Sequence, residues 1–340
     1  MRETLPTDAT RARCSREGAR LRGAGGLRAL LLALLPAALG GCSLNKFTVD
    51  STAPVLLVGM SALDRESDLQ FAREGAPANL ITVETFLVSS PDNRALLEVL
   101  ANGYAQYPFA FLEDDLEALG DSGDPAQQRV LAQRSTHFYD RSFEHALHLA
   151  ALHDGSIRKA VAGDAAGLEA ALPRWKSPGD APGLFWMGLA MASAINLNKD
   201  DMDRIADLPK AIALLERAHT IAPAYFNHGA AMSLGVVYAS QGKEMGGDPE
   251  RARKLFDEVI TATGGRYLIA RTLLARTYAT VVQDRPLFEK TLKEVLATPA
   301  SVWPEQRLAN ELALKKAARY LTQVDDLFLP PEPAAKEKSR

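Results

Sequence analysis

The sequence predicts an all-α protein, an α-solenoid of stacked helical hairpins with a C-terminal capping helix. Three observations favour this fold class. Apolar residues recur at helical spacing through most of the chain, and no segment alternates apolar and polar residues as a half-buried strand would. A motif typical of paired helices also returns at a period of about 34 residues, which is a repeat length of helical solenoids.

The first 41 residues are predicted to be a signal peptide that takes no part in the fold. Arginines dominate as far as Arg28, and residues 29–39 are apolar throughout. That run is too short to cross a membrane, which takes about twenty helical residues. It is followed by Gly-Gly-Cys, which resembles the lipobox of bacterial lipoproteins, so we expect a lipid on Cys42. A plain secretory signal with a chance cysteine is the alternative.

The residues around this cysteine also predict where the protein lies. Ser43 follows Cys42, whereas an Asp there would resemble an inner-membrane retention signal, so we expect a periplasmic protein anchored to the outer membrane rather than to the inner one. Residues 42–54 are polar and lack periodicity, and they are predicted to form a tether. Because Cys14 lies in the leader, the mature chain has no disulfide and no cysteine nucleophile.

An N-terminal helical region is expected over residues 55–155. Pro91 indicates the first turn of a new helix, with Ser90 as its N-cap. The last helix of this region carries histidines that favour solvent or interface roles over a metal site, because one ion could not reach enough of them. The expected helices are 55–71, 77–88, 94–106, 109–119 and 124–152, and the histidines are His137, His145, His148 and His153.

Two segments have a different composition from the helices. Residues 156–183 are rich in Gly, Ala, Pro and charge, and they are predicted to form a loop-rich joint with one short helix over 165–172. The tail, residues 330–340, consists mainly of Pro, Ala and charged residues and is predicted to be disordered. The segment between them, 184–329, is therefore where the repeats should be clearest.

Residues 184–329 contain the pattern of tetratricopeptide repeats. A large apolar residue, a small residue and an aromatic residue mark the first helix of a hairpin, while Ala, a large apolar residue and Pro mark the second. Small residues at the contact let the two helix axes approach, and the helix from Trp303 to Leu327 has one apolar side with which to cap the stack. The matches are Trp186, Leu189 and Ala190 with Ala211, Leu215, Ala218 and Pro223; Leu234, Gly235 and Tyr238 with Ala252 and Phe256; and Leu274, Ala275 and Tyr278 with Leu287, Leu292 and Pro299.

Three stretches carry a more specific resemblance. They lie within residues 75–104, 246–256 and 307–328, and they contain Ser-Pro-Asp-Asn, Gly-Gly-Asp-Pro-Glu-Arg-Ala-Arg and Arg-Leu-Ala-Asn-Glu-Leu-Ala. They resemble the T component of tripartite ATP-independent periplasmic (TRAP) transporters, a family of periplasmic tetratricopeptide lipoproteins. The resemblance implies a lipid-tethered homo-oligomer, with a trimer as the expected form, that contacts the substrate-binding P protein. It also suggests transfer of an apolar or small organic ligand to that protein.

The residues expected to bind a ligand lie on the first helices of two repeats. Trp186, Asn196, Tyr225, Asn227 and Met232 combine aromatic, amide and thioether side chains, which suit a concave surface that takes apolar ligands or an extended peptide. Packing in the repeat core is the alternative role for most of them. Repeat packing does not by itself require Asn196, Tyr225 or Asn227.

A loop insertion lies between two repeat helices, and the resemblance implies that it contacts the partner protein through Met245, Gly246, Gly247 and Asp248. Amides at a helix N-terminus could also hold an anion there. An aspartate in that place would repel an anion, however. We therefore interpret Asp248 as an N-cap and Pro249 as the first residue of the next helix.

The sequence contains no metalloprotease, phosphate-loop, nucleophile-elbow or dinucleotide-binding motif. We therefore expect no enzyme activity, no metal and no cofactor. Two acidic clusters, at residues 113–115 and 200–203, are interpreted as helix caps and solvated groups. A net charge of −3 without a basic stripe argues against nucleic acid as a partner, and the lipid is expected to be the only membrane contact.

These features favour an auxiliary binding component of a TRAP-type uptake system. Two other functions stay open. One is a scaffold lipoprotein that binds envelope proteins through its concave groove and has no cavity for a small molecule. The other, with less support, is an envelope hydrolase, for which no nucleophile or metal constellation is visible.

Overall fold

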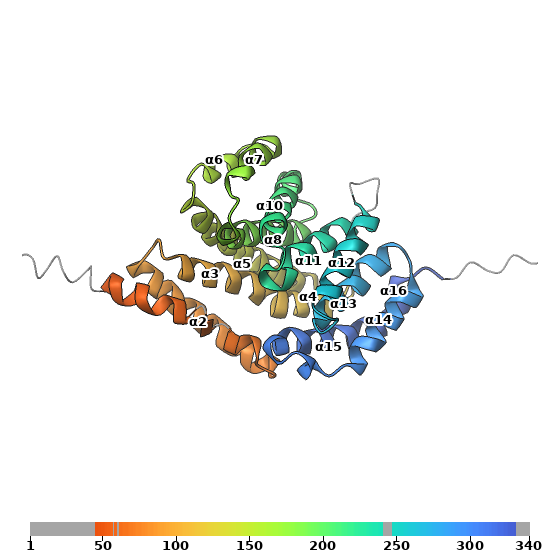
Figure 1. Cartoon of the computed structure of the whole chain (residues 1–340). Helices are drawn as coiled ribbons and strands as arrows, with labels where there is room; N and C mark the ends of the chain where they lie inside the picture. The colour runs from red at the N-terminus through yellow and green to blue at the C-terminus, as the bar shows by residue number, and fades with distance from the viewer. Residues whose placement is uncertain (1–44, 57, 60, 241–246, 331–340) are drawn as a thin grey trace, which may run out of the picture. The chain divides into compact units, whose positions relative to one another are not determined.

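The structure, a computed structural model, describes residues 45–56, 58–59, 61–240 and 247–330. The predicted signal peptide, Cys42 and the tail 331–340 lie outside the described residues, and their roles stay predictions. From Thr48 onward the chain forms one compact unit, and the predicted boundaries within that unit also stay predictions. The described residues are helical with no strand, which confirms the all-α fold class (Figure 1). None of the helices in the described part is long and apolar enough to span a membrane.

The first helical hairpin consists of a helix within residues 45–64 and α2 (Leu69–Ser89). Residues 45–54 are helical, so the prediction of an irregular segment there was wrong. Its polar composition hides two apolar positions one turn apart, since Val49 and Ala53 pack against Leu80 and Val83 of α2. The predicted helix 55–71 is instead broken at residues 65–68, where Asp68 caps α2.

Three other helix ends differ from their predictions. Pro77 lies inside α2 rather than at the start of a helix, and Ser90 ends α2, while Asn93 is the N-cap of α3 (Arg94–Tyr107). Pro108 does not separate two helices, because it opens a wider π-helical turn, η1 (Pro108–Leu112), that leads directly into α4 (Glu113–Leu119). Local proline signals therefore misplaced these boundaries.

The segment 156–183 holds more structure than predicted. The expected short helix is present as α7 (Ala165–Ala171), but α6 (Ile157–Ala162) was missed. Trp175 is fully buried, and its indole N–H donates to the Ala150 carbonyl of α5 (Pro125–Ala151) at 3.1 Å. The segment thus packs onto the end of α5. It also contains the 3₁₀ turns η2 (Leu172–Arg174) and η3 (Pro178–Asp180).

The predicted repeat hairpins pair as expected. Helix α8 contacts α10, α11 contacts α12, and α13 with η5 contacts α14. The close approach of α8 and α10 requires Gly188, since a Cβ atom there would lie 3.0 Å from the Ala211 carbonyl oxygen. The elements are α8 (Ala181–Leu197), α9 (Met202–Ala206), α10 (Leu208–Ile221), α11 (Tyr225–Ala239), α12 (Pro249–Ala262), α13 (Leu268–Leu273), η5 (Leu274–Ala279), α14 (Arg285–Ala297), η6 (Ala300–Val302), η7 (Pro304–Gln306), α15 (Arg307–Thr322) and α16 (Val324–Leu327).

The capping helix α15 does more than end the stack. It packs on α13 and α14, as a cap should, but it also reaches α2 and α4 near the start of the compact unit (Figure 1). Lys316 and Arg319 form ion pairs with Glu117 of α4, and Leu308 packs in a cluster with Leu69. The first and last parts of the unit are therefore joined directly.

Candidate functional site

Two of the predicted ligand-binding residues meet in a hydrogen-bonded chain. Trp186 of α8 is fully buried, and its indole N–H donates to the Tyr225 hydroxyl of α11 at 2.9 Å. That hydroxyl donates in turn to the Glu98 carboxylate of α3 at 2.8 Å. The chain Trp186–Tyr225–Glu98 thus links three helices. Sequence reasoning missed Glu98, because its partner lies 127 residues away.

Glu98 is held in an apolar setting. Burial raises its pKa, and the hydrogen bond from Tyr225 and the charge of Arg94 lower it only in part, so the pKa stays above its ordinary value. Burial and the neighbouring carboxylate also raise the pKa of Tyr225 well above normal, so its hydroxyl keeps its proton. A half-buried carboxylate behind a neutral phenol can accept a hydrogen bond from a ligand or form an ion pair with a positively charged ligand.

The start of α11 has an unusual backbone. Phe226, Asn227 and His228 have φ values of 50°, 54° and 61°, so three consecutive residues other than glycine adopt the left-handed conformation. Each such residue costs about 1 to 2 kcal/mol relative to the right-handed form. The turn places the Phe226 ring against that of Trp186, with 4.7 Å between ring centroids. Strain of this kind gathers at functional sites, which motivates a functional interpretation of the turn.

The close packing around this turn depends on a glycine. A Cβ atom on Gly229 would lie 2.7 Å from the ring of Phe185, nearer than such atoms approach in folded proteins. Phe185 also packs on Trp186, with ring centroids 4.5 Å apart. The aromatic cluster (Phe185, Trp186, Tyr225 and Phe226) is therefore one tightly fitted unit.

Asn227 connects the turn to a second polar group. It lies near Tyr267, a buried residue just before α13, and it lowers the pKa of Tyr267 less than burial raises it. The nearby charge of Asp64 raises it further. Burial also raises the pKa of Asp64 to about 6. A second weakly acidic carboxylate thus lies beside a buried phenol.

Tyr267 is held in place from the capping helix. The amide of Asn310, which is fully buried in α15, accepts from the Leu268 N–H at 2.9 Å and donates to the Arg266 carbonyl at 3.0 Å. It also donates to the Ala300 carbonyl at 3.2 Å. Asn310 is a residue that the sequence reasoning missed, although it lies in one of the stretches that carried the family resemblance.

The other two predicted ligand residues do not join this arrangement. Asn196 is exposed at the far end of α8, ten residues beyond Trp186, which is about 15 Å along a helix. Met232 is half-buried and packs against the hydrophobic core. The geometry therefore brings together Trp186, Tyr225 and Asn227 from the predicted set.

Comparison with known proteins decides the family. The profile described as TRAP transporter T-component matches residues 65–328, most of the chain. This chain belongs to the TRAP transporter T-component family. It is also 24% identical over 265 residues to an uncharacterized protein of Treponema pallidum (strain Nichols), a match that covers 78% of this chain and 81% of that protein. The aromatic cluster and all the contacts of Asn310 lie within the matched region.

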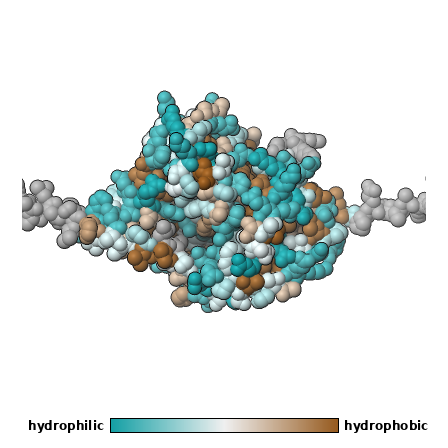
Figure 2. Space-filling view, in the orientation of Figure 1, coloured by the Kyte–Doolittle hydropathy of each residue, from teal (hydrophilic) through white to brown (hydrophobic). Residues whose placement is uncertain are grey.

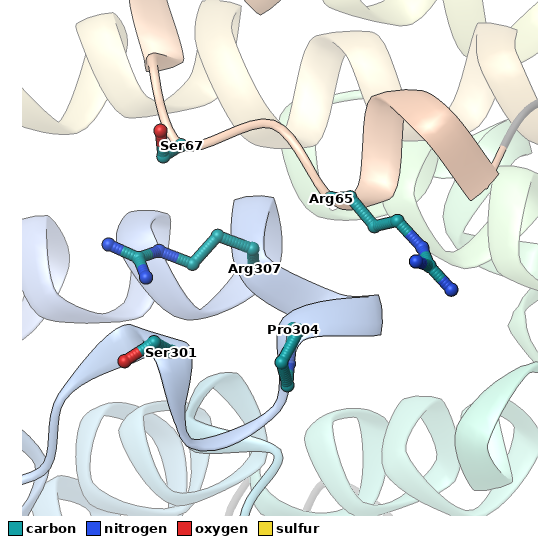
Figure 3. Close-up of a pocket in the computed structure, with 5 residues that line it drawn as sticks. All are labelled: Arg65, Ser67, Ser301, Pro304 and Arg307. Atoms are coloured by element: carbon teal, nitrogen blue, oxygen red, sulfur yellow. The ribbon is translucent and has the colours of Figure 1, made fainter.

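One cavity in the described part of this T-component measures about 370 Å³ and lies between the turn after the first helix and the start of α15. Its lining is Arg65, Ser67, Ser301, Pro304 and Arg307. Figure 3 shows the Arg307 guanidinium between the two serines, while Arg65 points away from it. Both arginines have acidic partners, Glu305 for Arg65 at 3.5 Å and Glu311 for Arg307 at 2.6 Å. Polar side chains lie around the cavity, but both of its arginines are paired with carboxylates.

A second, smaller cavity of about 160 Å³ lies between α5 and α8. Its floor is apolar, with Tyr139 and Ala194 buried, and Arg204 pairs with Asp140 at its rim at 3.0 Å. This volume suits one large side chain and is below the range of about 300 to 1,000 Å³ that is usual for ligand pockets.

The predicted partner-contact loop is described only in part. Met245 and Gly246 lie outside the described residues. Asp248 accepts a hydrogen bond from the Arg251 N–H at 2.9 Å and caps α12, whose first residue is Pro249, so the N-cap interpretation is confirmed. The contact of Gly247 and Asp248 with a partner stays a prediction.

Two histidines of α5 contact α2 and the turn that follows it, whereas His137 is exposed. His145 lies 3.0 Å from Glu84 of α2, and His148 lies 2.9 Å from Asp92 in the turn that follows α2. His153 lies just beyond the end of α5, contrary to prediction. No group of three or more ligating side chains in the described part could hold a metal ion.

The acidic clusters have different fates. Asp201 caps α9, as expected. Asp114 does not: it is only 1% exposed and forms ion pairs with Lys315 and Arg319 at 2.7 Å each, so its interpretation as a cap or solvated group was wrong. A neighbouring carboxylate, Glu113, is half-buried and accepts a hydrogen bond from the Tyr139 hydroxyl. Asp114 can be buried because cations far away in the sequence balance its charge, and helical periodicity cannot reveal such partners.

Proposed function

We propose that this T-component is a non-enzymatic, lipid-anchored periplasmic protein that binds the substrate-binding P protein of a TRAP system. We also propose that it holds a small organic ligand at the aromatic cluster. Membership of the family over residues 65–328 supports the transport context. The left-handed turn of residues 226–228 supports the ligand site.

The turn supports the ligand proposal because its left-handed residues are strained, and a regular repeat helix would have no such strain. Three left-handed residues bring Tyr225 and Asn227 toward two different polar partners, Glu98 and Tyr267, while the aromatic rings remain packed behind them. Aromatic walls with a few polar groups are typical of small-molecule sites. The carboxylates of Glu98 and Asp64 favour a ligand with a hydrogen-bond donor or a positive charge over an anionic one.

The anchor proposal concerns residues before the compact unit. A lipid on Cys42 would hold the protein at the periplasmic side of the outer membrane, as the lipobox-like sequence and Ser43 suggest. Metabolic labelling with a radioactive fatty acid should mark the wild-type chain and not Cys42→Ser. Label on both chains, or on neither, would exclude the lipid anchor at this residue.

Native mass spectrometry tests the binding proposals. The lipid-free chain, purified from its own periplasm, is measured alone and with the P protein of the same organism. We expect a stoichiometric complex with the P protein, and a retained small molecule that is lost in Tyr225→Phe. The matched control is Tyr278→Phe, because Tyr278 is also half-buried on a repeat helix but lies outside the aromatic cluster.

Each outcome has a separate meaning. A small molecule retained equally by both variants would remove the aromatic cluster as its site. A folded protein with no complex and no ligand would contradict the transport role and favour the envelope scaffold. A complex without a ligand would keep the P-protein contact and reject the small-molecule site.

A further inference from the structure

The cavity between α5 and α8 is an apolar recess in the surface. Its volume is about 160 Å³, and none of the residues of the aromatic cluster lines it. Phe143 of α5 and Met191 of α8 line it as half-buried side chains, beside four buried residues. Figure 2 shows a face of the molecule on which hydrophilic side chains dominate and hydrophobic ones lie in separate patches. Scattered patches need no partner, whereas a recess can enclose one. The four buried residues are Tyr139, Ala190, Ala194 and Ile195.

The rim of this recess is polar, and its charges are already paired. Arg204 donates to both carboxylate oxygens of Asp140, at 3.0 and 3.1 Å, and Asp207 lies 2.8 Å from Lys210. A ligand that required a free charge at the rim would have to break one of these pairs. A large apolar side chain would break neither, and the rim would exclude water around it, as happens around the anchor residues of protein interfaces. The recess therefore favours an apolar side chain.

The surface that borders the recess is acidic. Six carboxylates and three cations lie there on α5 and on residues 198–210, while α8 has no charged residue. Arg141 of α5 is not counted, because it pairs with Glu84 of α2. Glu144, Asp200 and Asp203 are exposed and make no ion pair with another residue of the described part. They would attract a positively charged partner. The carboxylates are Asp140, Glu144, Asp200, Asp201, Asp203 and Asp207, and the cations are Lys199, Arg204 and Lys210.

We infer that this recess is a docking site for a basic segment of a partner protein, which inserts one large apolar side chain between α5 and α8. The flexible thioether of Met191 can adapt to the shape of a Leu, Met or Phe side chain. Lys or Arg residues on either side of that anchor would face the exposed carboxylates. The surface is separate from the aromatic cluster, so the inference does not depend on the proposed ligand site or on the transport role.

A bilayer and a free small molecule fit this site less well. An acidic surface is repelled by anionic lipid, and helices that lie on membranes carry Lys and Arg on their polar face. The volume of the recess is also below about 300 Å³, the lower end of the range for small-molecule pockets. A single side chain that belongs to a longer segment needs less room, because the rest of the segment lies outside on the charged rim.

Fluorescence anisotropy with a labelled peptide tests the inference. The probe is Gly-Lys-Lys-Leu-Lys-Lys-Gly, and the protein is the lipid-free chain from Ser43 onward, which contains the compact unit. We expect a dissociation constant below about 1 mM. Replacing the Leu of the peptide by Ala should weaken binding at least about 10-fold, because the buried apolar side chain is lost. No binding at all, or equal binding of the Leu and Ala peptides, would overturn the inference.

Two protein variants separate the acidic border from the recess. Asp200→Lys combined with Asp203→Lys should weaken binding of the Leu peptide at least about 10-fold, because both positions would then repel it. The matched control is Asp325→Lys with Asp326→Lys, since these residues are also adjacent in an acidic segment and exposed, on α16. Ala194→Leu fills the recess and should make the Leu and Ala peptides bind alike. Equal loss in the two charge variants would contradict the proposed site.

Methionine-methyl NMR locates the bound peptide directly. On addition of the Leu peptide, the methyl resonance of Met191 should shift, whereas that of Met187, which is fully buried on the same helix, should not. The Ala peptide should move the Met191 resonance much less. A Met191 resonance that stays in place while the peptide is bound would show that the peptide binds elsewhere, and the inference would be wrong.

Discussion

Substitutions in the ion cluster between α4 and α15 should differ in how much they destabilise the protein, depending on which charge they remove. It contains two carboxylates, Asp114 and Glu117, and three cations, Lys315, Lys316 and Arg319. Asp114 and Lys316 are each 1% exposed, and Lys316 lies 2.9 Å from Glu117. We expect Asp114→Asn to destabilise the protein strongly and Lys316→Met to do so weakly.

The magnitudes follow from what each substitution leaves behind. Asp114→Asn leaves three cations around one carboxylate, with Lys316 buried, and removing one member of a buried ion pair costs about 3 to 5 kcal/mol. Lys316→Met leaves two cations facing two carboxylates and places a methionine of similar length in an enclosed site. Since the two remaining cations still balance the two carboxylates, no buried charge is left unpaired, and we expect a cost of about 1 kcal/mol or less.

Thermal and urea unfolding of the two variants measure this difference. Asp114→Asn should lower Tm by about 6 to 10 °C, and Lys316→Met by about 2 °C or less. The reasoning is refuted if Lys316→Met costs as much stability as Asp114→Asn does.

The same comparison has a predicted pH dependence. Burial raises the pKa of Asp114, but the hydrogen bonds from Arg319 and Lys315 outweigh it and bring the pKa below 3.8, the ordinary value. A carboxylate with a lowered pKa contributes stability that is present above its unfolded pKa and is lost as pH falls through the folded value. The difference between wild type and Asp114→Asn should therefore be complete at pH 7 and shrink below about pH 4.

Three further substitutions test the aromatic cluster and its neighbours. Tyr225→Phe removes the donor to Glu98, so it should cost about 1 to 3 kcal/mol and raise the pKa of Glu98 further, which carboxyl-carbon NMR titration measures. Gly229→Ala should cost about 1 to 3 kcal/mol in thermal unfolding, because its methyl group would collide with Phe185. For Asp64, the folded-state pKa of about 6 exceeds the ordinary 3.8, so folding favours its protonated form and stability falls as pH rises between these values. Asp64→Asn should thus be more stable than the wild type at pH 7, by up to roughly 3 kcal/mol, and equal to it below pH 4 in urea unfolding.

Local patterns predicted the repeats well. The hairpins α8 with α10 and α11 with α12 were foreseen because small residues such as Ala190 and Ala211 recur at fixed spacing, and the contact between the two helices lies within one hairpin. The same reasoning paired Trp186 with Tyr225 as site residues, since both occupy first helices of adjacent repeats. Periodicity is informative wherever the partner is the next element along the chain.

Contacts between distant segments were not predictable in this way. Glu98, Asp114 and Lys316 all lie at helical positions whose spacing suggests a solvated face, yet their partners lie 127 or more residues away. The left-handed turn at residues 226–228 also gave no signal, because such turns usually contain glycine and this one does not. A single sequence cannot show which distant partners stabilise these arrangements.

The capping helix α15 contacts both the N-terminal helices of the unit and the candidate site. Its contact with the site is made by Asn310, which hydrogen-bonds the backbone around Tyr267. Asn310→Ala would leave the Leu268 N–H and the Arg266 and Ala300 carbonyls without their partner, at a cost of about 2 to 4 kcal/mol. Since Asn310 fixes the backbone on both sides of Tyr267, we expect Tyr267 to move and Asp64 to become more exposed.

The pKa of Asp64 is therefore the sensitive measurement. In Asn310→Ala it should fall from about 6 toward 3.8, as followed by carboxyl-carbon NMR. Asn310→Asp is the matched control, because it keeps the acceptor for the Leu268 N–H and loses only the donor to the two carbonyls. It should lose stability but shift the pKa less. An unchanged pKa of Asp64 in Asn310→Ala would mean that Tyr267 keeps its position without the Asn310 hydrogen bonds. The packing of α15 and the candidate site would then be independent.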